Sequence, residues 1–143
     1  MDNKNIEILN KIHKGIVMGM ESISVLEPKV GDRNFRDDLN TQYNEYGKIL
    51  DRINSTANTS NIELADTSAG EKVMGWANLQ MNTMVDKSNS QISEILIRGN
   101  TMGIIEGRKL LNQNPDSAQE VKDILNEFVK LQENNIEKLK TYL

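Results

Sequence analysis

The sequence predicts an all-α protein, an antiparallel four-helix bundle, and three observations support that prediction. Apolar residues recur at spacings of three and four along four stretches of the chain. Aromatic residues make up only 4% of the chain and there are two prolines, a composition that favours helices over a β-sandwich. A chain of 143 residues has the length of one domain that buries a core without metals or disulfides. We therefore expect a single helical bundle domain over residues 1–143.

A clear turn separates the first two predicted helices. Apolar residues at helical spacing predict one helix from Asn5 to Glu27, and Pro28 disfavours helical geometry in the residue before it. Gly31 and Asp32 supply turn chemistry, and Asp32 is placed to cap the second helix, expected from about Arg33 to Thr56. The two helices should be antiparallel. Their apolar stripes are Ile6, Leu9, Ile12, Ile16, Met20 and Ile23, and then Phe35, Leu39, Tyr43, Tyr46, Leu50 and Ile53.

A third helical pattern is much longer than the first two. It follows a polar connection at residues 55–68 and continues from about Ala69 to Asn112. Ser68 and Glu71 have the spacing of a capping box at its start. We expect either one extended third helix that overhangs the bundle or a break near Gly99.

The fourth predicted helix follows the sequence NQNPDSAQE and runs to the carboxyl end. Asp116 or Ser117 is placed to cap it. Four amphipathic helices of this kind bury their apolar faces against one another in a bundle. The apolar stripe of the fourth consists of Val121, Leu125, Phe128, Ile136 and Leu139.

Composition and charge exclude several classes of protein. The chain contains no cysteine, which excludes disulfides, thiolate nucleophiles and Cys-ligated zinc. Its formal net charge is -4, acids and bases are interleaved, and no cluster of Lys and Arg indicates nucleic-acid binding. The amino-terminal residues lack the apolar core of a signal peptide, and no apolar run reaches membrane-spanning length. We expect a cytoplasmic protein with neither nucleic acid nor membrane as a partner.

Metal chemistry is the first function to weigh in a four-helix bundle. A carboxylate-bridged di-iron site needs a Glu from each of two helices and a Glu-x-x-His pair from each of the other two. The chain has one histidine, His13, and no Glu-x-x-His pair. Projection at about 100° per residue turns Glu21, Asp86 and Glu133 away from the apolar stripes. We therefore expect no metal site, no cofactor and no catalytic residues.

The helical layout and the carboxyl-terminal sequence EFVKLQENNIEKLKTYL resemble a family of uncharacterised bacterial ferritin-like four-helix bundle proteins of unknown function. The resemblance implies a ferritin-like bundle. Where a ferritin-like protein has Glu-x-x-His on its last helix, this chain has Glu133-Asn134-Asn135-Ile136. We carry over the fold alone, and a ferritin-like metal-binding or redox protein is the alternative function.

The polar stretch DKSNSQ, residues 86–91, interrupts the apolar stripe of the third predicted helix. Ser88 and Gln91 project inward, either as part of a buried polar layer or as the lining of a small pocket. His13 lies at the edge of the first stripe, where a neutral imidazole could form a hydrogen bond across the core. The candidate polar layer consists of His13, Ser88, Gln91, Gln132 and Asn135.

Glycines recur at every fourth residue in the stretch GNTMGIIEG. Each glycine costs a helix interior about 1 kcal/mol relative to alanine, so Gly99, Gly103 and Gly107 need a compensating gain. Glycines four apart form a groove that lets a second backbone approach closely, and the first helix has its own pair at Gly15 and Gly19. We expect the groove of Gly99, Gly103 and Gly107 to pack against a neighbouring helix, for which the helix of Gly15 and Gly19 is one candidate, and the alternative is a hinge at Gly99.

Two rows of apolar residues point away from the predicted bundle. Met18 and Val25 form a row on the first helix, and Leu79, Ile97 and Ile104 form a row on the third. An apolar row along one helix face suggests a covered surface, and self-association is the usual cover. We therefore expect a homo-oligomer, most simply a homodimer, and a non-enzymatic bundle protein that acts through self-association or protein–protein interaction.

Overall fold

The computed structural model is helical almost throughout. It describes residues 1–65 and 69–143, and residues 69–74 by their backbone alone; no strand occurs in this part of the chain. The all-α prediction is therefore confirmed. The helices are α1 (Asn3–Leu26), α2 (Arg33–Thr59), α3 (Ala69–Asn82), α4 (Asn89–Gln113) and α5 (Gln119–Lys140), with a short 3-10 turn, η1 (Glu27–Lys29), after α1.

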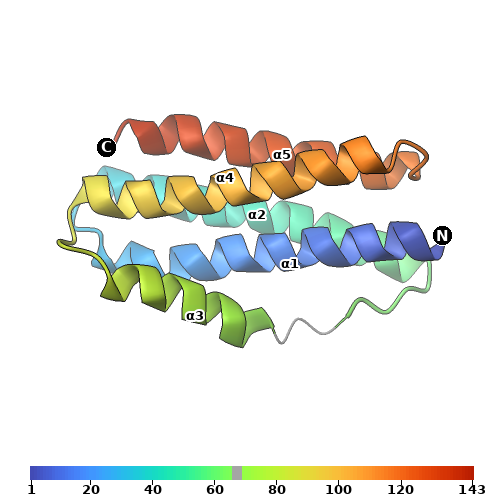
Figure 1. Ribbon diagram of the computed structural model, residues 1–143, viewed down its shortest axis with the longest axis horizontal. Helices are drawn as coiled ribbons and strands as arrows, with labels where there is room; N and C mark the ends of the chain where they lie inside the picture. The colour runs from blue at the N-terminus through green and yellow to red at the C-terminus, as the bar shows by residue number, and fades with distance from the viewer. Residues whose placement is uncertain (66–68) are drawn as a thin grey trace.

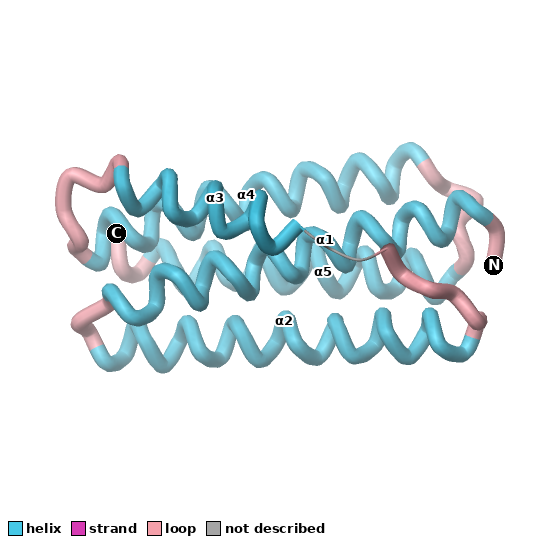
Figure 2. Tube along the Cα trace, turned by 90° about the horizontal axis from the view of Figure 1, so that it is seen from below, coloured by secondary structure: helices cyan, strands magenta, loops and turns pink. Residues whose placement is uncertain are grey.

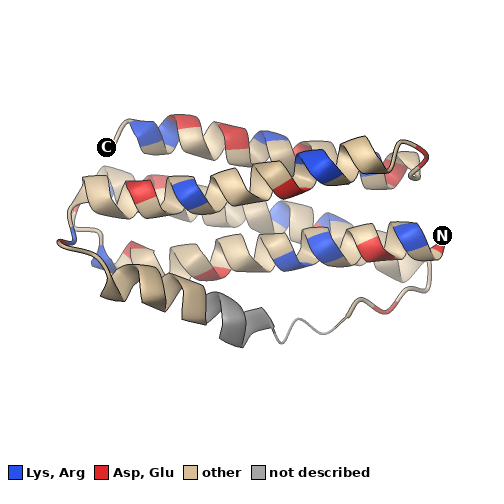
Figure 3. Ribbon diagram, in the orientation of Figure 1, with Lys and Arg blue, Asp and Glu red and all other residues tan. Residues whose placement is uncertain are grey.

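The long helices lie side by side along the length of the molecule (Figures 1 and 2), and the chain reverses direction at each connection. α5 packs most extensively against α4 and also contacts α2, while α1 contacts α2, α4 and α5. The shorter α3 lies against α1 and covers only part of its length (Figure 1). Lys and Arg are interspersed with Asp and Glu along the long helices (Figure 3).

The third predicted helix is two helices, and the break between them lies at residues 83–88 instead of near Gly99. Ser88 caps α4, because its Oγ accepts a hydrogen bond from the Gln91 N–H at 3.2 Å. Asp86 Oδ1 accepts the N–H of Ser88 at 2.9 Å. Short polar side chains that bond to nearby backbone groups compete with helical hydrogen bonding, which explains the break. The expectation of an extended third helix is wrong.

The two inward positions predicted in this stretch change accordingly. Ser88 is exposed, and Gln91 is half-buried with its Nε2 donating to Glu94 Oε2 at 3.2 Å. Neither belongs to a buried polar layer. The prediction extends one helical projection through residues that form a turn, so the inward facing that it assigns to Ser88 and Gln91 is wrong.

Two of the predicted helix starts had different outcomes. Asp32 caps α2 as predicted, with its Oδ1 accepting the N–H of Phe35 at 2.8 Å. At α5, neither Asp116 nor Ser117 occupies the cap position, which Ala118 takes without a side-chain hydrogen bond. The buried Asn5 supplies the missing acceptor, because its Oδ1 accepts the Ala118 N–H at 3.0 Å. A distant residue thus caps α5 and joins its start to the start of α1. The capping box predicted at Ser68 and Glu71 lies outside the described residues.

The apolar stripes meet in one contiguous core between the helices. Tyr43 is an exception to the predicted stripe of α2, because it is exposed, whereas Ile49 is buried. Within the described residues, no helix combines the length and apolar character that crossing a membrane requires. The largest fully buried side chains are Ile8, Leu9, Ile12, Ile16, Leu26, Phe35, Leu39, Ile53, Ile92, Ile95, Ile124 and Leu125.

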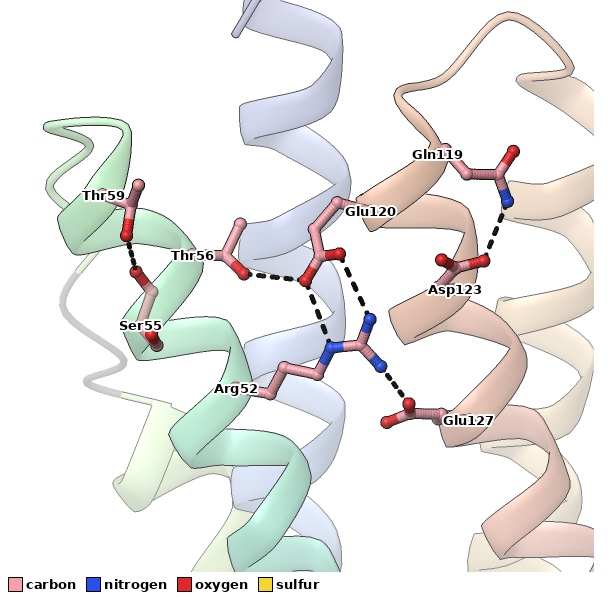
Figure 4. A network of polar contacts seen from close by, with 8 residues as sticks. All are labelled: Arg52, Ser55, Thr56, Thr59, Gln119, Glu120, Asp123 and Glu127. Carbon is pink, nitrogen blue, oxygen red and sulfur yellow. Dashed lines mark hydrogen bonds and ion pairs between the residues drawn. The ribbon is translucent and has the colours of Figure 1, made fainter.

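A network of charged residues joins α2 to the start of α5 (Figure 4). Arg52 donates from Nε to Glu120 Oε1 at 3.1 Å and from Nη2 to Glu120 Oε2 at 3.2 Å, and it also pairs with Glu127. Thr56 Oγ1 donates to the same Glu120 carboxylate at 3.2 Å. The hydrogen bonds from Arg52 hold the pKa of Glu120 below its usual value. This network therefore stabilises the fold near neutral pH and loses that contribution as acid protonates Glu120.

Replacing Arg52 with methionine is expected to lower the free energy of unfolding by less than about 1 kcal/mol, because exposed ion pairs contribute little. The side chains of Glu120 and Glu127 are nearly half exposed. Urea unfolding of both proteins at low and high salt measures the effect, and the difference should shrink as salt screens the pairs. A loss that stays the same at high salt would contradict the assignment of this contribution to exposed ion pairs.

Candidate functional site

A cavity of about 390 Å³ lies between α1 and α4. Trp76 of α3, Tyr46 of α2 and Phe128 of α5 also line it, so all five helices contribute. Its size falls within the range of roughly 300 to 1,000 Å³ that is typical of small-molecule sites. The apolar part of the lining consists of Ile12, Met18, Ile23, Trp76, Leu96, Met102, Leu110 and Phe128.

Four of the five predicted packing glycines line this cavity, two from each of the helices that face each other. They are Gly15 and Gly19 on α1, and Gly99 and Gly103 on α4. Side chains of neighbouring helices, and not a second glycine backbone, occupy the space beside these glycines. A Cβ atom at Gly15 would lie 2.9 Å from Phe128 Cζ. The glycines therefore make room for large side chains from neighbouring helices.

The same holds at the other glycines of the two faces. A Cβ at Gly19 would lie 2.6 Å from Tyr46 Cζ, and one at Gly103 would overlap the side-chain amide of Gln132. Gly107 lies outside the cavity and is buried against α5, where a Cβ would lie 2.5 Å from Val129 Cγ2. α4 is a continuous helix through Gly99, so this residue is no hinge between two elements.

A buried polar cluster forms the inner side of the cavity. Tyr46 Oη donates to Asn100 Oδ1 at 3.1 Å, and Asn135 Nδ2 donates to the same oxygen at 3.2 Å. Asn100 Nδ2 donates to the carbonyl of Leu96 at 2.8 Å. Burial raises the pKa of Tyr46, against a smaller opposing effect of Asn135, so its phenol is neutral at physiological pH. Tyr46 and Asn100 line the cavity, and their hydrogen bonds hold α2, α4 and α5 together.

This cluster replaces the predicted polar layer in part. Gln132 and Asn135 are buried as expected, and Gln132 lines the cavity. Sequence reasoning missed Asn100 and Tyr46. Asn100 did carry a signal, because it lies on the same face of its helix as Leu96 and is a polar residue within an apolar stripe. Such a residue, when buried, requires hydrogen-bond partners on another helix.

His13 does not join the polar cluster. It is half-buried, and its Nδ1 is buried without a hydrogen-bond partner among the described residues. Burial lowers the pKa of His13, because desolvation disfavours the imidazolium. Gln132 donates to the carbonyl of Phe128 and Asn135 donates to Asn100, so the hydrogen bond across the core that was predicted between His13 and one of these two amides is not formed.

The lowered pKa of His13 predicts that the protein becomes less stable in mild acid. The unfolded chain binds a proton near pH 6.5 and the folded chain binds it only at lower pH, so unfolding is favoured as the pH falls through that window. Urea unfolding between about pH 7.5 and 5.5 should show a decreasing free energy of unfolding, and His13→Gln should remove most of that slope. His13 is the only histidine in the chain, so an unchanged slope in the variant would contradict this assignment.

Three charged side chains line the cavity, and we call them the mouth: Lys11, Lys14 and Glu106. All three are exposed. Lys11 forms an ion pair with Glu7, because its Nζ lies 3.4 Å from Glu7 Oε1. Among the described residues, Lys14 forms no ion pair within 4.0 Å. The mouth therefore has two ammonium groups and one carboxylate.

The residues predicted to form an outer interface occupy mixed positions. Met18 is half-buried and lines the cavity, and Val25, Ile97 and Ile104 are half-buried elsewhere. Leu79 is exposed as predicted, at 58%. The most exposed apolar side chains of α4 are Met102 and Ile105, at 50% and 52%, and neither was predicted.

Among the described residues, no group of three or more Asp, Glu or His side chains comes together as a metal ion would require. Comparison with protein-family models, with curated proteins and with solved structures finds no match to this chain.

Proposed function

We propose that this chain is a non-enzymatic binding protein whose cavity between α1 and α4 takes a small, largely apolar molecule. The observation that supports the proposal most is the cavity itself, about 390 Å³ in volume with mainly apolar walls drawn from five helices. A bundle commonly builds its ligand site from side chains on facing helices.

The hydrogen bonding of the cavity supports binding over catalysis. Ser22, a lining residue with a hydroxyl group, donates its proton to the backbone carbonyl of Met18 at 2.8 Å and not to a basic side chain. Tyr46 is neutral and donates to Asn100. A general acid or base needs a pKa near the operating pH and a partner within hydrogen-bond reach. The polar groups here instead hold one another in place.

The proposal includes a ferritin-like arrangement of the four long helices. One long connection joins α2 to α4, it contains α3, and α3 packs on α1. A four-helix bundle with one long crossover is the ferritin-like connectivity. In this arrangement α3 is an accessory helix that adds Trp76 to the wall of the cavity.

Isothermal titration calorimetry with 1-decanol, a neutral apolar probe, tests the proposal. We expect saturable binding at one site. Gly99→Leu should abolish it, because the new side chain would start 3.4 Å from the Trp76 ring and extend into the cavity. Gly47→Leu is the matched control, since Gly47 is a helical glycine outside the cavity with only Met20 Cε at 4.0 Å. Equal binding by wild type and Gly99→Leu would refute the proposed site.

Self-association is a second candidate function, favoured by the exposure of Leu79 on α3 and of Met102 and Ile105 on α4. Large apolar side chains that are half exposed or more are candidates for an interface when a partner covers them. Multi-angle light scattering should then show a dimer that the double variant Leu79→Lys, Ile105→Lys converts to a monomer with unchanged helix content. A wild-type protein that is monomeric at high concentration would refute this candidate.

A further inference from the structure

We infer that the ligand of this cavity is a monoanionic amphiphile, an aliphatic chain ending in one carboxylate that lies at the mouth beside Lys14 and Lys11. The inference rests on the proposed function and specifies the chemistry of its ligand.

The charges of the mouth favour an anionic headgroup. Two of its three charged side chains are lysines, so the described lining has a net charge of +1 where the whole chain has -4. A carboxylate at the mouth is attracted by Lys14, which forms no ion pair within 4.0 Å among the described residues, although the chain as a whole repels anions. Lys11 is partly neutralised by Glu7 at 3.4 Å, which leaves Lys14 as the main partner for a carboxylate.

The walls determine the rest of the ligand. Gly15, Gly19 and Gly99 place no side chain in the space between α1 and α4. Apolar groups such as Phe128 and Ile12 bound that space. Met18 and Met102 also line it, and methionine adapts its shape to different apolar partners. A flexible hydrocarbon chain suits such a space.

The inner side of the cavity limits the ligand to one charge. Tyr46 and Asn100 are hydrogen-bonded to each other, and Asn100 is bonded further to Asn135 and Leu96. Apart from the three residues of the mouth, no described lining residue carries a charge near neutral pH. A second ionic group would lose its hydration there without a charged partner, which is costly.

Three probes of equal chain length test the inference by calorimetry: decanoate, 1-decanol and decylammonium. We expect decanoate to bind the wild type about fivefold more tightly than 1-decanol, a ratio that corresponds to one exposed ion pair of about 1 kcal/mol. Decylammonium should bind most weakly. The preference for decanoate should decrease with salt, because salt screens exposed charges.

Charge variants assign the preference to the mouth. Lys14→Gln should bring the affinity for decanoate down to that for 1-decanol measured with the same variant, so that the preference for the anion disappears. Lys130→Gln is the control, because Lys130 is an exposed lysine of α5 outside the cavity. Equal affinity of the wild type for all three probes would overturn the inference and leave the proposed cavity site intact. Absence of binding by every probe would overturn the proposed function, and the inference with it.

Discussion

Replacing Gly107 with leucine is expected to lower the free energy of unfolding by about 2 to 3 kcal/mol, the upper range for overpacking a well-filled contact. A Cβ at this position would lie 2.5 Å from Val129 Cγ2, and Val129 is itself buried. The branched valine side chain is short and stiff, so it has no alternative position. α4 and α5 must therefore move apart, and they share the most extensive contact in the protein.

Gly103→Leu is the informative comparison for this prediction. The three atoms nearest to a Cβ at Gly103 all belong to the end of the Gln132 side chain, which is flexible and lines the cavity. We expect a smaller loss there, and Gly47→Leu should be neutral or gain up to about 1 kcal/mol of helix propensity. Urea unfolding followed by circular dichroism gives all three values. A midpoint for Gly107→Leu at or above that of the wild type would contradict the packing described for α4 and α5.

Replacing Asn100 with alanine is expected to cost about 3 kcal/mol of stability, because each buried donor left without an acceptor costs about 1 to 3 kcal/mol. Asn100 Oδ1 accepts hydrogen bonds from Tyr46 and Asn135, and all three residues are buried. Tyr46→Phe should cost less, about 0.5 to 1.5 kcal/mol, because it removes the hydroxyl donor and leaves no buried donor without an acceptor.

The double variant of Tyr46→Phe and Asn100→Ala isolates the coupling. Its cost should be smaller than the sum of the single costs, because the phenol that Asn100→Ala strands is already gone. Asn126→Ala, at an exposed position of α5, is the control and should be close to neutral. Additive costs in the denaturant-unfolding cycle would show that Tyr46 and Asn100 do not act as one cluster.

Local signals in the sequence were sufficient for α1 and α2. α1 was expected from Asn5 to Glu27 and runs Asn3–Leu26, and α2 begins at Arg33 as expected. The apolar period defines the body of each helix, Pro28 marks the end of α1, and Asp32 marks the start of α2. These signals act within a few residues of where they occur, so one sequence is enough to find them.

One error arose from a local ambiguity, and another arose where the outcome depends on residues far apart in the chain. The polar residues before Ser88 read equally well as the outer face of a helix or as a turn, and the turn displaced the predicted facing of Gln91. The cap of α5 comes from Asn5, more than a hundred residues away. A distant partner such as Asn5 cannot be recognised from periodicity, because periodicity shows which face of a helix is buried and not what covers it.

For the candidate site too, local sequence signals predicted one part, and contacts between distant residues determined the rest. The glycine pattern indicated that α1 and α4 each have a face without side chains, and both faces line the cavity. The sequence could not show that Phe128, Tyr46 and Gln132 fill the space beside these glycines. That depends on which helices are neighbours, and hence on how the chain crosses from α2 to α4.

An X-ray structure of the protein crystallised with ω-bromodecanoate tests the central claim, the cavity as a ligand site, most directly. The bromine atom gives an anomalous signal that locates the end of the hydrocarbon chain without ambiguity. We predict a single peak between α1 and α4, enclosed by Phe128 and Gly15, with the carboxylate at Lys14. Bromine found only on the outer surface, with the space between α1 and α4 closed by the protein's own side chains, would contradict the claim.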